Sequence, residues 1–335
     1  MKYKRLGRCG LKVSEISLGA GNWGVGAMDD KAVREIMALA MDHGIIYFDN
    51  AESYGDGASE ECMGRVLKQL DWPRVRYIVS TKFFWGISKG PNEKNTLNRK
   101  YLRQGIDKAL QRTQLDYIDI AYCHRPDPHT PIEETVWAFH NMIEAGKVLY
   151  WGTSEWSADE LRAAWDIAER HHLHKPVVEQ PEYNLLKRRK VDHEYRRVCE
   201  DTGVGLAVWS ALAGGTLTGK YLDGIPADSR AAAMAGMPHL GRSLTEGRRI
   251  EIVAKLKAVA DDIGCSLAHL SLAWCALHPD VSTLILGVSR PAQLLDNLKA
   301  LEAVPKLTAD VRARIDAAVG DYSESWVGNS PWHYE

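Results

Sequence analysis

Four reactive side chains stand where segments with the pattern of buried strands come to an end: Asp49, Tyr54, Lys82 and His124. The apolar and aromatic run IIYF at 45–48 leads directly into Asp49, as in a strand that is buried on both faces and surfaces at its C-terminal end. Tyr54 lies on the glycine-containing loop that follows, Lys82 ends the run VSTK, and His124 follows AYC. A carboxylate, a phenol, an ammonium and an imidazole are side chains of acid–base chemistry.

Each of these residues also has a purely structural interpretation. Lys82 is compatible with a solvated strand end, and His124 with a buried histidine whose hydrogen bonds are satisfied. The loop around Tyr54 is compatible with a solvated turn that carries one aromatic lid. These interpretations suit the residues one at a time, whereas four such residues at equivalent strand ends favour a functional site.

The segments that must position these residues alternate between strand and helix patterns. Strands are expected at 15–23, 45–49, 77–83, 117–123, 148–153, 177–180, 205–210 and 282–287. Helices are expected from the caps at 29–30 to about 40, from Ser59 as an N-cap, and at 96–113, 131–145, 158–170, 192–201, 247–263, 266–278, 291–300 and 309–319. Eight strand-then-helix units favour an α/β fold, a single (β/α)8 TIM barrel over residues 1–335 with its active site at the C-terminal ends of the strands. Turn glycines within 3–12 predict an N-terminal β-hairpin that closes the other face, and 309–319 is an extra C-terminal helix.

One segment contains a motif that is typical of a different fold. Residues 19–24, GAGNWG, match the G-x-G-x-x-G pattern of dinucleotide-binding sheets, and Asp49 ends the next strand. In that fold the glycines open directly into a helix, whereas here residues 25–28 intervene before the helix cap. The strand–helix repeat that continues to residue 300 also fits an open doubly wound sheet poorly, so a Rossmann domain is disfavoured.

Composition and charge limit the classes of function. Of 335 residues, 45% are hydrophobic and 26% are charged, and the net charge of −2 gives no reason to expect binding to nucleic acid or to an anionic membrane. The sequence contains no apolar signal segment and no run of 18 apolar residues, so neither secretion nor membrane insertion is expected. The six cysteines are far apart and form no CxxC pair, which indicates reduced thiols in a cytoplasmic protein.

Two clusters of basic side chains predict no function. His171, His172 and His174 have no second group of metal ligands beside them in the sequence, so no metal site is expected. The run KRRK at 187–190 lies in a slightly acidic chain and is expected to be solvated.

The motifs together resemble the aldo-keto reductase superfamily, and most closely its branch of voltage-gated potassium channel β subunits and their bacterial relatives. The similarity rests on Asp49-x4-Tyr54-Gly55, on Lys82 and on HRPD at 124–127. The segments RPDPHTPIEET, YWGTSEW and QPEYN extend it over about 3–307. The resemblance implies a barrel that binds NADPH without a Rossmann fold and reduces an aldehyde or ketone to an alcohol.

The catalytic roles implied by the resemblance agree with elementary chemistry. Reduction of a carbonyl needs a proton for the oxygen, and a free tyrosine with a pKa of about 10 is a poor acid near neutrality. Tyr54 is the expected general acid, with the Lys82 ammonium stabilising the tyrosinate that it leaves. Asp49 is expected to keep Lys82 charged and oriented, and His124 to donate a hydrogen bond to the substrate oxygen.

The resemblance also assigns residues to the cofactor. Ser154 and Gln180 match groups that hold the nicotinamide carboxamide, and Trp209 matches a ring behind the nicotinamide. The loop 210–215 offers backbone donors for the pyrophosphate, while Arg290 favours NADPH over NADH because a guanidinium suits a phosphate dianion. The complete assignment is Asn22, Trp23, Asp49, Ser154, Gln180, Trp209, Ser210, Ala211, Leu212, Ala213, Gly214, Lys220, Arg230, Gly287, Ser289, Arg290, Gln293 and Asn297.

Some assignments remain open at the level of sequence. An apolar or aromatic carbonyl substrate is expected between aromatic side chains and the catalytic groups, with the substrate residues Trp23, Tyr54, Trp85 and His124. Glu155 follows Ser154 where relatives often carry Asn or Arg, so one contact near the nicotinamide is uncertain. His124 stands where the β subunits commonly carry Asn, which favours reductase competence. The sequence does not decide whether Trp326 and Trp332 in the aromatic tail pack on the barrel, cover the substrate mouth or meet another subunit.

Two classes of function fit the resemblance. The favoured one is a cytoplasmic NADPH-dependent carbonyl reductase acting on a small molecule. The alternative is a regulatory or redox-sensing subunit that binds the cofactor tightly and reports its oxidation state to a membrane channel. Resemblance to the β-subunit branch also implies a homo-oligomer, with a tetramer among the forms it could take.

Overall fold

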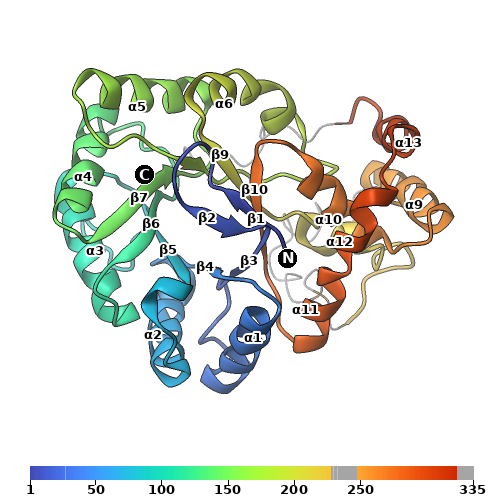
Figure 1. Ribbon diagram of the computed structural model, residues 1–335, viewed down its shortest axis with the longest axis horizontal. Coiled ribbons are helices and arrows are strands. Elements are labelled where there is room, and N and C mark those ends of the chain that lie inside the picture. Colours follow the sequence, from blue (N-terminus) through green and yellow to red (C-terminus); the bar gives the residue numbers. More distant parts are fainter. Residues whose placement is uncertain (27, 228, 230–231, 233–246, 323–335) are drawn as a thin grey trace.

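The computed structural model describes residues 1–26, 28–227, 229, 232 and 247–322. Eight parallel strands close into a barrel in the order β10-β3-β4-β5-β6-β7-β8-β9. The expected TIM barrel is therefore confirmed, and the open sheet suggested by GAGNWG is excluded (Figure 1). The strands are β3 (Ile16–Gly19), β4 (Tyr47–Asp49), β5 (Ile78–Phe83), β6 (Ile118–Cys123), β7 (Val148–Thr153), β8 (Val178–Glu179), β9 (Gly205–Trp209) and β10 (Val281–Leu286).

Helices surround the barrel and bury their apolar faces against it (Figure 1). Polar side chains cap several of them: Asp29, as expected, and also Ser157, Ser266 and Thr308 each accept a backbone N–H in the first turn of a helix. The α-helices are α1 (Asp30–Asp42), α2 (Ala58–Leu70), α3 (Arg99–Thr113), α4 (Ile132–Glu144), α5 (Ala158–Arg170), α6 (Arg196–Thr202), α9 (Gly247–Asp262), α10 (Leu267–Leu277), α11 (Pro291–Leu298), α12 (Ala300–Ala303) and α13 (Ala309–Val319). The short helical turns are η1 (Tyr54–Gly57), η2 (Arg74–Arg76), the π-helical η3 (Lys190–Glu194), η4 (Ala213–Thr218) and η5 (Val304–Lys306).

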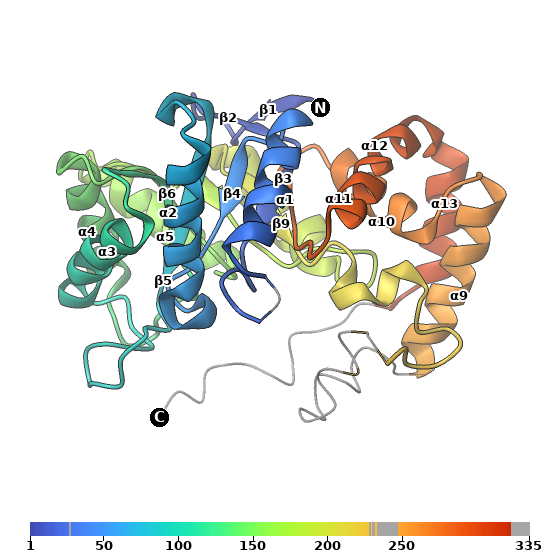
Figure 2. The ribbon, with the colours of Figure 1, turned by 90° about the horizontal axis from the view of Figure 1, so that it is seen from below.

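The predicted N-terminal hairpin closes one end of the barrel. Strands β1 (Tyr3–Arg5) and β2 (Lys12–Ser14) pair antiparallel, and the hairpin lies across the barrel end that faces the viewer in Figure 1. Leu6 and Val13 are completely buried, and they belong to the same apolar cluster as inward-facing residues of the barrel strands. Figure 2 shows the hairpin at the end of the barrel opposite to the loops in which most of the sequence-predicted site residues lie.

The two-residue period of the strands decides which side chains enter the site. Inside the barrel, β5 presents Ile78 at the hairpin end, and its next inward positions are 80 and 82. Strand β4 likewise presents Tyr47 and then Asp49, and β6 presents residues 120 and 122, with His124 next in the same register. An apolar layer next to the hairpin thus gives way to a polar layer and then to the reactive side chains at the open end.

Two details differ from the sequence-based expectation. Ser59 is not the N-cap of α2: the helix is preceded by Gly57 in a left-handed conformation (φ 94°), and the buried Ser59 hydroxyl donates to the Ala20 carbonyl oxygen at 2.6 Å. The serine therefore ties α2 to the loop after β3. The helix expected at 192–201 is divided into η3 and α6.

Some expectations concern residues outside the described part of the chain. Arg230, which was assigned to the phosphates, and the aromatic tail residues Trp326, Trp332 and Tyr334 belong to this group. Among the described residues, none of the helices combines the length and the apolar character needed to cross a bilayer.

We predict that Gly64→Ala destabilises the fold although alanine favours helices. A Cβ atom at this α2 position would lie 2.5 Å from the Thr113 carbonyl oxygen and 2.7 Å from that of Arg112. The overlap with backbone should lower the free energy of unfolding by about 1–3 kcal/mol, against a helix-propensity gain of about 1 kcal/mol. Urea unfolding measures the change. Gly247→Ala is the control, since its Cβ meets no atom of the described residues within 4 Å, and an equal effect of both substitutions would refute the packing argument.

Candidate active site

The centre of the site is a buried ion pair between β4 and β5. The Lys82 ammonium lies 2.5 Å from Asp49 Oδ2, and the two side chains are 0% and 2% exposed. The ammonium also donates to the Asn50 carbonyl oxygen at 2.7 Å. Burial alone would lower the pKa of Lys82, but the Asp49 carboxylate and the Tyr54 phenol together outweigh burial and raise that pKa above its usual value. Lys82 therefore stays cationic at neutral pH.

A polar layer below the ion pair orients Asp49. Its second oxygen, Oδ1, accepts from the Ser80 hydroxyl at 2.6 Å and from the Gln180 side-chain amide at 3.1 Å. Ser80 in turn accepts from the Tyr47 hydroxyl at 3.1 Å, and the hydroxyls of Tyr47 and Tyr122 are 2.9 Å apart. With Oδ1 engaged in this layer, Oδ2 is the oxygen that faces Lys82. Ser80, Tyr47 and Tyr122 were not among the predicted site residues, although the two-residue period of the strands places each of them on the inward face.

Tyr54 is brought to the ion pair by a tight turn after β4. It begins η1, where Gly55 (φ 59°) and Asp56 (φ 52°) adopt left-handed conformations that turn the chain sharply. The Tyr54 hydroxyl lies 3.4 Å from Lys82 Nζ, and the ammonium is 5.0 Å from the centre of the phenol ring. Asp49, Lys82 and Tyr54 therefore form a continuous chain from the buried carboxylate to a partly exposed phenol.

His124 completes the group beyond β6. Its ring meets the Tyr54 ring edge-on at 5.9 Å and the Trp85 ring edge-on at 6.2 Å, measured between ring centres. Burial, with added repulsion from the charges of Arg125 and Lys82, lowers the pKa of His124 well below its usual value, so the imidazole is neutral at pH 7. Its Nδ1 atom is buried and has no hydrogen-bond partner among the described residues.

The residues assigned to the nicotinamide adjoin Asp49. The Ser154 hydroxyl, just past β7, donates to the Gln180 carbonyl oxygen at 2.8 Å, and both residues are buried. Because the Gln180 side chain also donates to Asp49, Ser154 and Gln180 are connected to the ion pair through hydrogen bonds. The structure thus brings these predicted residues together with the four reactive ones.

Glu155 has a role that sequence analysis did not find. Its carboxylate is 2% exposed and accepts from the Trp209 indole N–H at 3.1 Å, the Lys190 ammonium at 3.0 Å and the Glu182 backbone N–H at 2.5 Å. Glu155 itself adopts a left-handed backbone conformation (φ 61°). The carboxylate therefore fixes Trp209, the ring assigned to the back of the nicotinamide, and joins the chain segments that follow β7, β8 and β9.

The loop after β9 has the form of an anion-binding turn. Leu212 (φ −100°, ψ 15°) is followed by Ala213 (φ 49°) and by Gly214 and Gly215 with positive φ. A right-handed residue followed by a left-handed one can direct backbone N–H groups into a concavity that suits phosphate. In this loop the N–H groups of Ala213 and Gly215 donate to the carbonyl oxygens of Ser210 and Leu212 at 2.7 and 2.9 Å. A Cβ atom at Gly215 would lie 3.1 Å from Lys220 Nζ, so this ammonium folds back against the same loop.

The residues assigned to the adenosine lie on the loop after β10 and in α11. The Ser289 backbone N–H donates to the Gln293 side-chain oxygen at 3.1 Å. Gly287, Arg290 and Gln293 are exposed, whereas Asn297 is buried. The loop after β10 lies at the same end of the barrel as the loop after β9, since both follow parallel strands.

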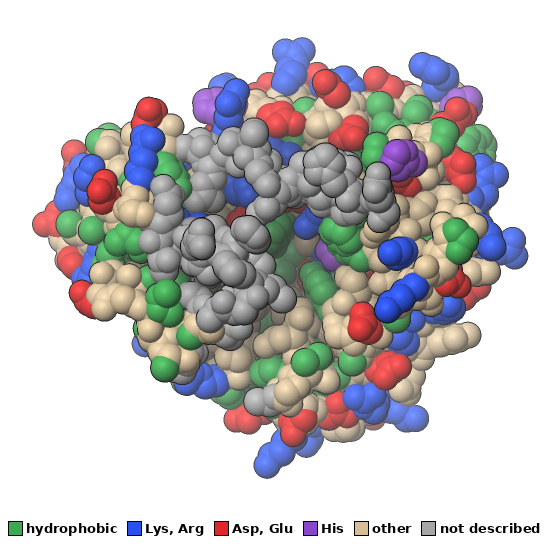
Figure 3. Space-filling model, turned by 180° about the vertical axis from the view of Figure 1, so that it is seen from behind, with side chains coloured by type: hydrophobic (Ala, Val, Ile, Leu, Met, Phe, Trp, Pro, Cys, Tyr) green, Lys and Arg blue, Asp and Glu red, His purple; other side chains and the backbone are tan. Residues whose placement is uncertain are grey.

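The aromatic residues expected around the substrate differ in exposure. Trp85 is half-buried and packs edge-on against Phe84, with ring centres 5.0 Å apart. Trp23 is fully buried, and its indole N–H has no hydrogen-bond partner in the described part of the chain, whereas Asn22 is exposed. Figure 3 shows that the face of the molecule opposite to the hairpin is hollowed near its middle, where hydrophobic side chains gather.

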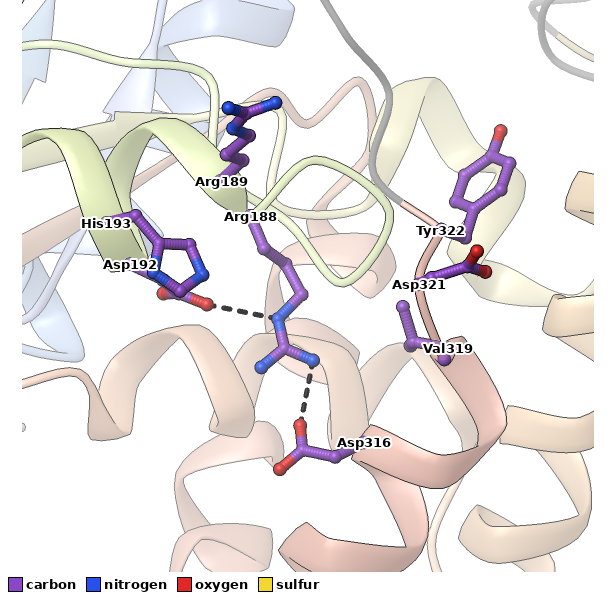
Figure 4. A pocket seen from close by; sticks show the side chains of 9 residues that line it. Arg188, Arg189, Asp192, His193, Asp316, Val319, Asp321 and Tyr322 are labelled. Atoms are coloured by element: carbon purple, nitrogen blue, oxygen red, sulfur yellow. Dashed lines mark hydrogen bonds and ion pairs between the residues drawn. The ribbon is translucent and has the colours of Figure 1, made fainter.

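A separate cavity of about 390 Å³ lies between η3 and the end of α13 (Figure 4). Arg188 projects toward it and pairs with Asp192 at 3.1 Å and with Asp316 at 2.8 Å. Its guanidinium is also 4.8 Å from the Trp274 ring. The Arg188 guanidinium pairs with both carboxylates and so links the two segments. Structural ion pairs therefore explain this cavity, and it contains none of the four reactive residues.

The structure is therefore a TIM barrel with a buried carboxylate–lysine pair, a phenol and a neutral histidine at its open end. Comparison with known proteins identifies the class to which it belongs. Residues 15–319 match the Aldo/keto reductase family, and the chain belongs to this family.

Three similar proteins have names that describe potassium channel subunits. A protein from Oryza sativa subsp. japonica named "Probable voltage-gated potassium channel subunit beta" is 46% identical over 320 residues, which cover 95% of this chain and 97% of the relative. A protein of the same name from Arabidopsis thaliana is 45% identical with the same coverage. A "Putative voltage-gated potassium channel subunit beta" from Schizosaccharomyces pombe is 41% identical over 94% of this chain and 92% of the relative.

The low pKa of His124 predicts a pH-dependent loss of stability. As pH falls below about 6.5, the unfolded chain protonates this histidine while the folded protein keeps it neutral, so folding is disfavoured. For one such proton the loss between pH 7.5 and 5.5 is about 1.4 kcal/mol. Urea unfolding at both pH values should show a larger loss for the wild type than for His124→Asn.

The variant comparison isolates His124 from other groups that titrate in this range. Burial raises the pKa of Glu179 to about 7 and lowers that of His278, but both residues are present in the wild type and in the variant. Equal losses in the two proteins would show that His124 is protonated in the folded state as readily as in the unfolded chain.

Proposed function

We propose that this protein is an NADPH-dependent reductase that converts a small aldehyde or ketone to an alcohol. The observation that carries the proposal is the buried chain from Asp49 through Lys82 to the Tyr54 hydroxyl, with distances of 2.5 and 3.4 Å. A phenol supported by a permanent cation is suited to give its proton to an oxygen that gains negative charge. Membership of the Aldo/keto reductase family supports this reaction class.

In the proposed reaction, Tyr54 is the general acid. NADPH, when bound, supplies the hydride that the carbonyl carbon receives. The Tyr54 hydroxyl protonates the carbonyl oxygen, and the Lys82 ammonium stabilises the tyrosinate that remains. Asp49 holds the ammonium in place through Oδ2 and is itself held by Ser80 and Gln180 through Oδ1.

His124 acts as a neutral hydrogen-bond donor in this proposal. An imidazole whose pKa lies well below its usual value carries a proton on one ring nitrogen at pH 7 and cannot serve as the stronger acid. Edge-on contact with Tyr54 and Trp85 fixes the ring direction. A carbonyl oxygen placed between the phenol and the imidazole would receive two hydrogen bonds, which orients it and stabilises its developing charge.

The described residues fit an NADPH molecule. Ser154 and Gln180 present polar groups beside Asp49, Trp209 presents a ring fixed by Glu155, and the turn at 212–215 with Lys220 is suited to phosphate. Arg290 occupies the N-cap position of α11, directly before Pro291, and the residue is exposed. We assign to it the 2′-phosphate that distinguishes NADPH from NADH.

Replacing Tyr54 tests the central role. Tyr54→Phe should lower multiple-turnover oxidation of NADPH with aldehydes by about 10²–10⁴-fold while leaving NADPH affinity nearly unchanged. The measurement is the loss of NADPH absorbance with a panel that includes an activated aromatic aldehyde and methylglyoxal, beside a fluorescence titration with NADPH. Tyr3→Phe is the matched control, since its exposed hydroxyl donates to Gly44 at the hairpin end of the barrel. Turnover retained in Tyr54→Phe would refute the assignment.

Replacing Arg290 tests the choice of cofactor. A charge-assisted hydrogen bond to phosphate is worth about 1.5–3 kcal/mol, or about 10- to 100-fold in affinity. Arg290→Ala should therefore weaken NADPH binding by that factor and leave NADH binding almost unchanged. Arg312→Ala, which removes an exposed guanidinium from α13, is the control. Similar wild-type affinities for NADPH and NADH would contradict the preference.

The names of the similar proteins support a second candidate function. A regulatory subunit would use the same residues to bind cofactor and report its oxidation state to a channel, which matches the description of the relatives as potassium channel subunits. The turnover assay separates the two functions. Many turnovers with free exchange of cofactor support the reductase, whereas a single slow turnover with tightly held NADPH and copurification with a membrane channel support the regulatory subunit.

A further inference from the structure

Three metal-ligating side chains converge on the outside of the barrel, between α4 and the segment after α5, which are neighbours in the helical layer (Figure 1). His140 Nδ1 and His174 Nδ1 are 2.8 Å apart, and Glu144 Oε1 lies 3.9 Å from His174 Nδ1. One ligand atom from each residue lies within 4.8 Å of the other two. These partners of His174 are not visible in the sequence, because His140 and Glu144 lie more than 25 residues before it.

We propose that His140, Glu144 and His174 form a binding site for one divalent transition-metal ion of the Zn²⁺, Ni²⁺ or Cu²⁺ type. Two imidazole nitrogens and one carboxylate oxygen are the donors that these ions prefer, whereas Mg²⁺ and Ca²⁺ prefer oxygen ligands alone. The site is independent of the proposed reductase function.

The distance between the two nitrogens agrees with a shared ion. With metal–nitrogen bonds of about 2.05 Å, two nitrogens at right angles around one ion lie about 2.9 Å apart, and two at a tetrahedral angle lie about 3.4 Å apart. The observed 2.8 Å is close to the right-angle arrangement found in octahedral and square-planar sites, which Ni²⁺ and Cu²⁺ adopt. Zn²⁺ would require the rings to separate by about half an ångström.

The fold holds the ligands in place before an ion arrives. His140 and Glu144 are four residues apart on α4 and so project from the same helix face. The Trp151 indole N–H donates to the His174 carbonyl oxygen at 2.8 Å, which fixes the backbone of His174 to β7. The Trp137 ring meets the His140 ring edge-on with centres 5.8 Å apart. Metal binding then needs only small side-chain rotations.

The charges also favour a cation. The Glu144 carboxylate offers a negatively charged oxygen donor, and an imidazole binds a metal through a ring nitrogen in its neutral form. Without a metal the two Nδ1 atoms share at most one hydrogen bond, and His140 Nδ1 also accepts from the His174 backbone N–H at 3.4 Å. Glu144 Oε1 lies 3.9 Å from His174 Nδ1, beyond hydrogen-bond distance. An ion would engage all three donors at once, and the partly exposed position of the residues lets it enter from solvent.

Isothermal titration of the full-length, chelator-treated protein with Ni²⁺ tests the site. Wild-type protein should bind one Ni²⁺ per chain at this site, and His140→Asn and His174→Asn should each weaken that binding at least tenfold. Glu144→Gln should weaken it by a smaller factor, because one oxygen donor is lost while both nitrogens remain. His172→Asn, an exposed histidine two residues from His174, is the control and should bind like the wild type.

A spectroscopic measurement distinguishes this cluster from other histidines in the chain. With one equivalent of Cu²⁺, electron paramagnetic resonance should show two coordinated imidazole nitrogens in the wild type and one in each single histidine variant. Unchanged circular dichroism and melting temperature without metal would confirm that the variants fold. Absence of saturable Ni²⁺ binding, or binding and spectra unchanged in the double variant His140→Asn/His174→Asn, would overturn the proposal.

Discussion

The site depends on one interaction, the ion pair of Asp49 and Lys82 inside the barrel. Removing two charges from water costs several kcal/mol for each ion, and attraction repays that cost only when the remaining hydrogen-bonding groups are satisfied. Here Asp49 Oδ1 has two donors, and Lys82 has a backbone carbonyl in addition to the carboxylate. The polar layer of Tyr47, Ser80 and Tyr122 is therefore a requirement of the charged pair.

The need to surround the buried ion pair with hydrogen-bonding groups also explains why a closed barrel suits the chemistry. A closed barrel of parallel strands places the last inward-facing residue of each strand around one opening. The hairpin, through Leu6 and Val13, seals the opposite end with apolar side chains. At the open end, Asp49 and Tyr54 outweigh burial and keep Lys82 charged, whereas burial and the charges of Arg125 and Lys82 keep His124 neutral.

The sequence determined the positions of the reactive residues because strand ends are local signals. Asp49, Lys82 and His124 each follow or end a buried apolar run, and their convergence follows from the topology of the barrel. The sequence did not reveal contacts between side chains and segments that are distant along the chain. Ser59 has the pattern of a helix cap, yet its hydroxyl binds Ala20 because the loop after β3 passes within reach. Glu155 seemed a departure from the family pattern, and only the fold places the Trp209 indole and the Lys190 ammonium against it.

In the proposed function, the residues assigned to proton transfer and those assigned to the cofactor lie on different parts of the fold. Asp49 and Lys82 lie on strands of the barrel, where burial and hydrogen bonds fix them. The turn at 212–215 and Arg290, which we assign to the phosphates, lie on connections beyond β9 and β10, where sequence change costs less packing. Changes in these connections can alter how long a cofactor stays bound without disturbing proton transfer. A fast reductase and a slow redox-sensing subunit can therefore share the same catalytic group, and the rate of cofactor release is the property that separates them.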